Sequence, residues 1–428
     1  EEKFMEGTRS WLDNLKIRGG WGVTGTAAID AYSSVSVLEQ TNYGLGGLLV
    51  PAYQYSKNVA NVMLGWEKSK NTNIGIDASF LGGRIDMALD YYFTKTEDVI
   101  WSKALPSTGG MYDASTNFQT NMNICETETQ GVELALNTRN IVTKDFTWTS
   151  NLTFTYSKEK ITKLATGAEY VTNGDDGKVL YMGEAVNSWY NYKLNGVWKT
   201  SEAADAAAFG MKPGDLKVDV PGMIHVSEGV YQKWVENEDG ERVLMTYDKD
   251  NPYAVSANDY QVLGHQNPDW TMGFKNTFTY KNFDLSIYMY WRWGQTIYYD
   301  MLGYYDPAGG AKNNFPTYFD YWTQETGDQD HYFPALNASS SSNNIKGFSG
   351  LSYVDGSFFK IKNITLGYTL PKKWGKTIGI EDLRVYATIT NPLVIQKSDL
   401  LKNYDPEMGG SIDYPLTKQL VFGVNLTF

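Results

Sequence analysis

The sequence predicts an all-β protein, specifically a transmembrane antiparallel β-barrel. Three observations predict it: apolar and polar residues alternate along many segments, these segments are long, and the connections between them alternate between short and long. The pattern is clear at residues 420–428, where every even position is apolar and the odd positions are mostly small or polar. Successive side chains of a strand face opposite ways, so such a strand has one face suited to lipid and one suited to an aqueous lumen.

The alternation recurs along the whole chain. It predicts ten strands, at residues 12–24, 66–81, 84–100, 123–141, 146–163, 266–281, 283–299, 359–371, 383–395 and 416–428. Strands of ordinary globular proteins have about 5 to 6 residues, whereas a tilted strand that crosses a membrane needs about 9 to 11. The length of the segments therefore favours a membrane barrel over a β-sandwich.

The connections between these strands are short and long in strict alternation. The short ones are at 82–83, 142–145, 282 and 372–382, and the long loops are at about 25–65, 101–122, 164–265, 300–358 and 396–415. Short turns are typical of the periplasmic side and long loops of the exterior. We therefore expect extracellular long loops and a periplasmic C-terminus. The loop 164–265 contains strand-like residues 189–199 and a hairpin at 231–247 with a turn at Asp239-Gly240, but a single crossing there would break the alternation.

Composition agrees with this fold class. The chain has 428 residues, of which 14% are aromatic, and 41 are Gly. The mean hydropathy of -0.40 is compatible with a barrel because half of each strand and all the loops are polar. The net charge of -12 argues against nucleic acid as a partner. Cys125 is the single cysteine of the sequence, so no internal disulfide framework is available, and we expect it to be inert.

The sequence shows no motif for catalysis, for a metal or for a cofactor. His225, His265 and His331 are far apart, and Asp248 begins a calcium-like loop in which Tyr253 occupies the position that requires Gly. We therefore expect no catalytic residues, no transition-metal site and no cofactor, although an incomplete calcium site at this loop stays open.

Candidate site residues follow from the predicted topology. Aromatic rings near the outer ends of strands suit stacking against sugar rings, or else pack the loops; these candidates are Trp101, Tyr112, Trp189, Tyr190, Tyr192, Trp198, Tyr298, Tyr299, Tyr304, Tyr305 and Trp322. Polar residues predicted to face the lumen, where they line a path or pair across strands, are Lys16, Arg18, Asp77, Asp86, Asp90, Glu133, Lys275, Asp284, Arg292 and Arg384. Residues predicted to face lipid are Phe422, Val424, Leu426 and Phe428, and residues expected in a periplasmic aromatic girdle are Phe80, Phe146, Phe283 and Phe428.

Several segments in order resemble the SusC/RagA group of TonB-dependent outer-membrane transporters. They are Leu15 to Gly25, Trp66-Glu67-Lys68 with Asn71 to Gly75, Arg84 to Tyr92, Leu105 to Gly109, Gln130 to Leu134, Pro213-Gly214-Asp215, Gly264 to Gly273, Phe283 to Ser286, Phe359 to Pro371 and Tyr414 to Phe428. The resemblance implies the C-terminal portion of a plugged barrel of about 22 strands. The plug domain and the remaining N-terminal half of the barrel would then lie outside this chain.

The resemblance also implies a function and partners. Transporters of this group sit in the outer membrane of Gram-negative bacteria and import oligosaccharides, or peptides in some cases, with energy from the TonB complex and with a SusD-like lipoprotein as a lid. We expect TonB to act through the N-terminal part, and lipid to surround the barrel. The alternative is a secreted or surface β-sandwich that binds glycans, and a carbohydrate-active enzyme is a third hypothesis.

Overall fold

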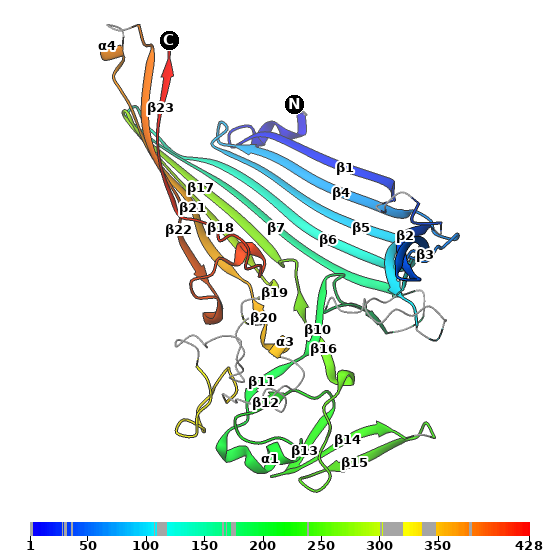
Figure 1. Cartoon of the computed structure of the whole chain (residues 1–428). Coiled ribbons are helices and arrows are strands. Elements are labelled where there is room, and N and C mark those ends of the chain that lie inside the picture. The colour runs from blue at the N-terminus through cyan, green and yellow to red at the C-terminus, as the bar shows by residue number, and fades with distance from the viewer. Residues whose placement is uncertain are drawn as a thin grey trace.

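A computed structural model gives the fold of the chain and describes residues 3–27, 29, 32–35, 37–106, 108, 118–164, 167, 169–172, 177–237, 239–299, 302, 320–335, 348–375 and 379–428. Ten strands in these residues form one antiparallel sheet (Figure 1). In their order across the sheet they are β1 (Leu12–Thr26), β4 (Glu67–Phe80), β5 (Ile85–Ala104), β6 (Gln119–Val142), β7 (Phe146–Leu164), β17 (Trp270–Tyr280), β18 (Phe283–Trp293), β21 (Phe358–Thr369), β22 (Asp382–Gln396) and β23 (Gln419–Thr427). The predicted all-β class with about ten long strands is confirmed.

The sheet is a curved wall, and each of its strands pairs with the wall strand that comes before it and the wall strand that comes after it in the sequence (Figure 1). Short connections follow β4, β6, β17 and β21, and the long connections follow β1, β5, β7, β18 and β22. Because neighbouring strands are antiparallel, the short connections lie at one end of the wall and the long ones at the other. β1 and β23 are the two edges of this sheet.

Four predicted strand boundaries differ from the structure by four residues or more. The strand expected at 283–299 leaves the wall after Trp293, because Gly294 has a φ of +85° and residues 296–298 pair elsewhere. The strand expected at 266–281 begins at Trp270, after Pro268, which has no N–H to donate to the ladder. The loop expected at 101–122 is shorter because β5 continues past a bulge near Asp98, so Trp101 lies in a strand opposite Met122.

A second unit, built from the long connections, lies at the end of the wall that carries these connections (Figure 1). Its strands are β8 (Tyr170–Thr172), β9 (Lys178–Tyr181), β10 (Ser188–Tyr192) and β16 (Tyr260–His265) in one sheet, β11 (Leu194–Val197) with β12 (Leu216–Val218), β13 (Met223–Ser227) with β14 (Val230–Glu236) and β15 (Arg242–Tyr247), and β19 (Thr296–Tyr298) with β20 (Tyr353–Asp355). A separate hairpin joins β2 (Leu38–Leu45) to β3 (Leu48–Tyr55). In β14 and β15, Tyr231 pairs with Tyr247, as the predicted hairpin requires.

Helices are few and short in the described residues. They are α1 (Ala203–Ala207), α3 (Phe348–Leu351) and α4 (Lys372–Gly375), with 3-10 helices η1 (Lys3–Thr8), η4 (Thr200–Glu202), η5 (Ala257–Asp259), η7 (Asp399–Leu401) and η8 (Pro406–Met408). Within the ranges that the structure describes, none of the helices has the length and apolar character needed to cross a membrane.

One large core holds the second unit together. Its buried side chains come from the loops that follow β7, β18 and β22, and include Phe209, Leu216, Phe333 and Leu401. A smaller core lies where β6 and β7, at the end of the wall that carries the long connections, meet β8 and β9. The loops that follow β7, β18 and β22 therefore pack against one another, and the loop that follows β7 also packs against the wall.

Candidate substrate-binding surface

Register places the predicted lumen-facing residues on one face of the wall, which we call the polar face. Residues directly opposite each other in an antiparallel pair share a face. Lys16 lies opposite Asp77, Asp90 lies opposite Glu133, and Lys275 lies opposite Tyr288. The same rule puts all ten predicted residues on the polar face, the others being Arg18, Asp86, Asp284, Arg292 and Arg384.

Arg18 joins three strands of the polar face. Its guanidinium donates to Asp77 on β4 at 2.8 Å and to Asp90 on β5, also at 2.8 Å. To reach Asp90 it passes over Gly75, which lies between the two residues in the register. A Cβ at Gly75 would overlap the Asp90 carboxylate and lie 2.8 Å from the Arg18 guanidinium carbon. The glycine is therefore needed for this ion pair.

The same arrangement recurs near the other edge of the wall. Arg384 on β22 donates to Asp284 on β18 at 2.6 Å, across β21. Gly367 of β21 lies between these side chains, and a Cβ there would overlap both. Ion pairs thus link strands of the polar face near both edges of the wall, as expected for a hydrated interior.

The opposite face of the wall, which we call the apolar face, carries the residues predicted to contact lipid. Phe422 is 75% exposed, and Val424, Leu426 and Phe428 are exposed as well. Within β23 the side chains of Phe422, Val424 and Leu426 alternate with those of Val421 and Gly423 on the polar face.

The structure corrects the expectation for several aromatic candidates. Tyr192, Trp198 and Tyr299 are buried in the large core, and Trp189 is buried beneath Tyr353, its ring centroid 5.4 Å away. Sequence alone could not separate a stacking ring from a core ring, because both occur in loops rich in aromatic residues. In this structure other side chains cover these four rings.

The other aromatic candidates are less enclosed or lie elsewhere. Tyr190 and Tyr298 are half-buried, Trp101 packs on the smaller core, and Trp322 packs on the large core and donates to the Gly327 carbonyl. Tyr112, Tyr304 and Tyr305 lie outside the described residues.

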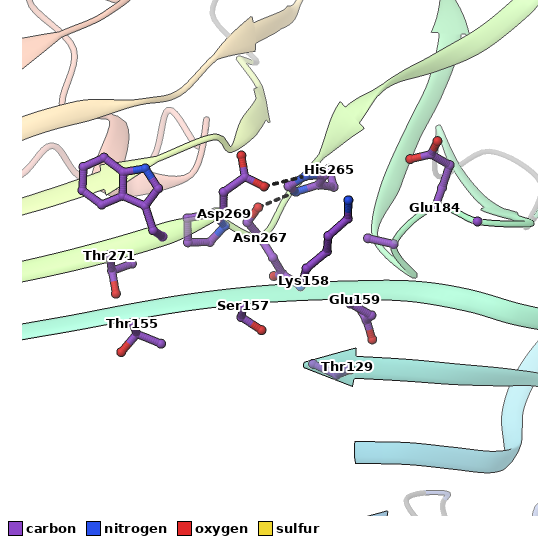
Figure 2. Close-up of a pocket in the computed structure, with 14 residues that line it drawn as sticks. Thr129, Thr155, Ser157, Lys158, Glu159, Glu184, His265, Asn267, Asp269 and Thr271 are labelled. Atoms are coloured by element: carbon purple, nitrogen blue, oxygen red, sulfur yellow. Dashed lines mark hydrogen bonds and ion pairs between the residues drawn. The ribbon is translucent and has the colours of Figure 1, made fainter. Parts of the chain in front are cut away.

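A cavity of about 570 Å³ opens where the polar face meets the second unit (Figure 2). Thr155 and Ser157 of β7 and Thr271 of β17 line one side. Glu184 reaches the cavity from the β9–β10 connection, which is fixed to β7 by a hydrogen bond from the Gly183 amide to the Ile161 carbonyl at 2.9 Å. The cavity is therefore built from both the wall and the second unit.

His265 and Asp269 supply an imidazole and a carboxylate on the far side of the cavity (Figure 2). The imidazole Nδ1 donates to the Asn267 carbonyl at 2.5 Å, and Nε2 lies 3.5 Å from the Asp269 carboxylate. With Lys158 and Glu159 also lining it, the cavity offers hydroxyls, carboxylates and amines. Such a mixture suits a hydroxyl-rich or peptide ligand.

A buried lysine fixes the last long loop to the wall. The side chain of Lys360 on β21 is 1% exposed, and its ammonium lies 2.5 Å from Asp405 and 2.8 Å from Glu407. Burial of Glu407 opposes its ionisation, but hydrogen bonds from Lys360 and Lys362 outweigh burial and lower the pKa of the carboxyl. We call these four residues the lysine anchor.

The lysine anchor and the cavity were not among the predicted site residues. A register shift between Ile361 and Asn363 changes the alternation just where Lys360 lies, so the sequence pattern gives no signal for it. The acidic pair Asp405 and Glu407, flanking Pro406 in a long loop, was the one available hint.

Metal-ligating side chains do not gather in the described part of the chain: no group of three or more His, Cys, Asp or Glu lies close enough to hold an ion. The Asp248 carboxylate accepts hydrogen bonds from the amides of Asp250 and Asn251. It therefore closes its own turn.

Known proteins are similar to this chain over its whole length. No family model matches it. It is 31% identical over 443 residues to the TonB-dependent receptor SusC of Bacteroides thetaiotaomicron, and 27% identical over 452 residues to the TonB-dependent receptor P3 of Formosa agariphila. The chain belongs to the SusC-like TonB-dependent receptors. It corresponds to a C-terminal part of their barrel and spans about 40% of the length of these relatives, that is 39% of SusC and 40% of P3.

A solved structure agrees with the fold of this SusC-like chain. The RagAB peptide transporter superposes with a TM-score of 0.76 at 24% identity, covering 100% of this chain and 42% of the matched chain. At this identity the likeness concerns the fold alone. Relatives of this kind are outer-membrane transporters and not enzymes.

Proposed function

We propose that this chain forms part of an outer-membrane, TonB-dependent importer of oligosaccharides or peptides. The observation that carries the proposal is the ten-stranded wall with one polar and one apolar face, in a chain that aligns over its whole length with SusC. Cargo would pass along the polar face, and the apolar face with Phe422, Val424, Leu426 and Phe428 would contact lipid.

The orientation follows from the same reasoning. The end of the wall that carries the second unit would be extracellular, and Phe428 would end in the periplasm. In this orientation the cavity beside His265 opens at the outer end of the polar face, where cargo would enter first. Trp101, Tyr190, Tyr298 and Trp322 remain candidates for cargo contact.

The importer would need further parts. β1 and β23 leave unpaired strand edges, which cost several kcal/mol per unsatisfied group in lipid, so preceding strands of the same barrel would close the wall. A plug and a TonB-contact segment would come from that N-terminal part. The similarity to SusC supports a SusD-like lipoprotein as the lid over the outer loops.

The alternative β-sandwich is not favoured by the wall. Sandwich strands have about 5 to 6 residues and bury one face of each sheet against the other, whereas β6 has 24 residues and the apolar face of β23 is exposed.

Growth on defined nutrients tests the proposal. A strain that lacks the gene for the complete transporter should lose growth on one class of oligosaccharide or peptide as sole carbon source while growing normally on its monomers. Equal growth of mutant and parent on every oligosaccharide and peptide, with no polymer accumulating outside the mutant, would contradict import.

A further inference from the structure

Three tyrosines meet on one side of the four-stranded sheet of the second unit. Tyr170 of β8, Tyr181 of β9 and Tyr190 of β10 form what we call the tyrosine platform. The rings of Tyr170 and Tyr181 are parallel within 2° with centroids 6.0 Å apart, and Tyr190 lies 5.5 Å from Tyr170 and 6.4 Å from Tyr181. None of these contacts involves the large core.

The platform faces away from the wall. On β8 and β9 the residues Val171 and Leu180 form a pair and pack in the smaller core with Ile161 of β7. Ile161 lies opposite Thr127, and Thr127 has the same parity in β6 as the polar-face residue Thr129. Ile161 is therefore on the polar face of the wall, and the four-stranded sheet packs on that face. Because neighbouring residues of a strand point to opposite sides, Tyr170 and Tyr181 lie on the other side of this sheet, toward the space that the polar face borders.

Neighbouring side chains hold the platform in position. The Tyr181 hydroxyl donates to the Glu169 carboxylate at 2.5 Å. Tyr260 packs edge-on against Tyr190 at 5.6 Å and against the buried Tyr192 at 4.5 Å. Burial raises the pKa of Tyr190 to about 12, so its hydroxyl stays neutral. Ordered rings lose little entropy when a ligand stacks on them.

One ring of the platform is open to solvent. Tyr170 is 43% exposed, while Tyr181 and Tyr190 are half-buried. An exposed aromatic ring beside hydroxyl and carboxylate groups matches a pyranose, whose C–H face is apolar and whose rim carries hydroxyls. The adjacent Glu169 carboxylate and the net charge of -12 disfavour acidic sugars.

We propose that the tyrosine platform is a carbohydrate subsite that stacks pyranose rings of a neutral oligosaccharide. The inference rests on the proposed import function and names its cargo class as glycan. A peptide would instead use backbone partners along a strand edge, and β8, which is the edge of this sheet, has only three residues.

Calorimetric titration of the complete transporter tests the platform. The probes are maltoheptaose, cellohexaose, xylohexaose, laminarihexaose and mannohexaose, with a tryptic digest of casein as the peptide probe. We expect one of the oligosaccharides to bind and Tyr170→Ala to raise its Kd about tenfold or more, because removing the ring removes the stacking surface. Tyr170→Phe keeps the ring and should stay within about threefold of the parent.

Tyr55→Ala is the matched control, since Tyr55 is an exposed tyrosine of a different outer hairpin, and its Kd should not change. An unchanged Kd in Tyr170→Ala, with a bound oligosaccharide in the parent, would overturn the platform and leave the import function standing. Binding of casein peptides with no oligosaccharide bound at millimolar concentration would overturn the glycan assignment, again without touching import. Binding of no probe at all would also count against the platform, and the growth experiment above decides import separately.

Discussion

Replacing Lys360 by Met tests whether the lysine anchor holds the last long loop against the wall. The ammonium contacts both Asp405 and Glu407 and is almost fully buried. Methionine keeps most of the length of the side chain but removes the ammonium group and its charge. Two carboxylates would then remain at the wall, with only Lys362 to offset them.

The structure sets the size of the expected effect. Removing one partner of a buried charge pair costs about 3–5 kcal/mol, because the other charge stays desolvated. Asp405 is 11% exposed and Glu407 26% exposed, so the lower half of this range, about 3–4 kcal/mol, applies. At 1.4 kcal/mol per factor of ten, local opening of the loop should become about 100 to 1,000 times more frequent.

Hydrogen exchange measured by mass spectrometry on the complete transporter reports this opening. Amides of residues 399–408 should exchange faster in Lys360→Met, while amides of β6 keep the parent rate. Lys372→Met is the control, because the Lys372 side chain is 72% exposed and lies 3.8 Å from Asp382, and exposed pairs contribute little. The triple variant that adds Asp405→Asn and Glu407→Gln should recover part of the protection. Unchanged exchange at 399–408 in Lys360→Met would refute the anchoring role.

Three further variants or conditions probe the wall and the loop. Gly75→Ala should lower the free energy of unfolding in lipid vesicles by about 1–3 kcal/mol, because the new Cβ separates Arg18 from Asp90. The control Gly20→Ala, whose new Cβ has nothing within 4 Å, should change this free energy by less than about 0.5 kcal/mol. Equal effects of the two variants would contradict the need for glycine at position 75. The protection of the amides of residues 399–408 against hydrogen exchange, corrected for the intrinsic exchange rate, should be constant above the ordinary Glu pKa of about 4.3. It should fall as the pH drops through the lowered pKa of Glu407. A loss of protection that begins near neutral pH would contradict this prediction. Phe422→Arg should cost about 2–4 kcal/mol of unfolding free energy in a bilayer and Val421→Arg less than about 1 kcal/mol; the reverse order would place lipid on the wrong face.

The wall could be predicted from sequence because its physical requirements are periodic. A strand between lipid and water must alternate over its full length, and the boundaries of β7 and β22 follow from that pattern within about two residues. The polar face followed from the same alternation. The pairing of Arg18 with two acids was less accessible, because it depends on which strands are neighbours and on a glycine between them.

The second unit could not be predicted to the same depth. Its strands have only three to seven residues, and their packing depends on contacts between loops far apart in sequence, as for Phe209 and Leu401 in one core. Residue type alone therefore did not show which aromatic rings are buried: Trp198 is a core residue, whereas Tyr170, which was not singled out, is exposed. Alternation also failed where β18 leaves the wall at Gly294.

A nitroxide scan of residues 421–424 in the complete transporter, reconstituted in lipid bilayers, tests the central claim most directly. If the ten-stranded sheet is a membrane wall, labels at 422 and 424 should collide with dissolved oxygen and be shielded from a water-soluble paramagnetic reagent, while labels at 421 and 423 show the reverse. An aqueous environment at all four positions would contradict the account.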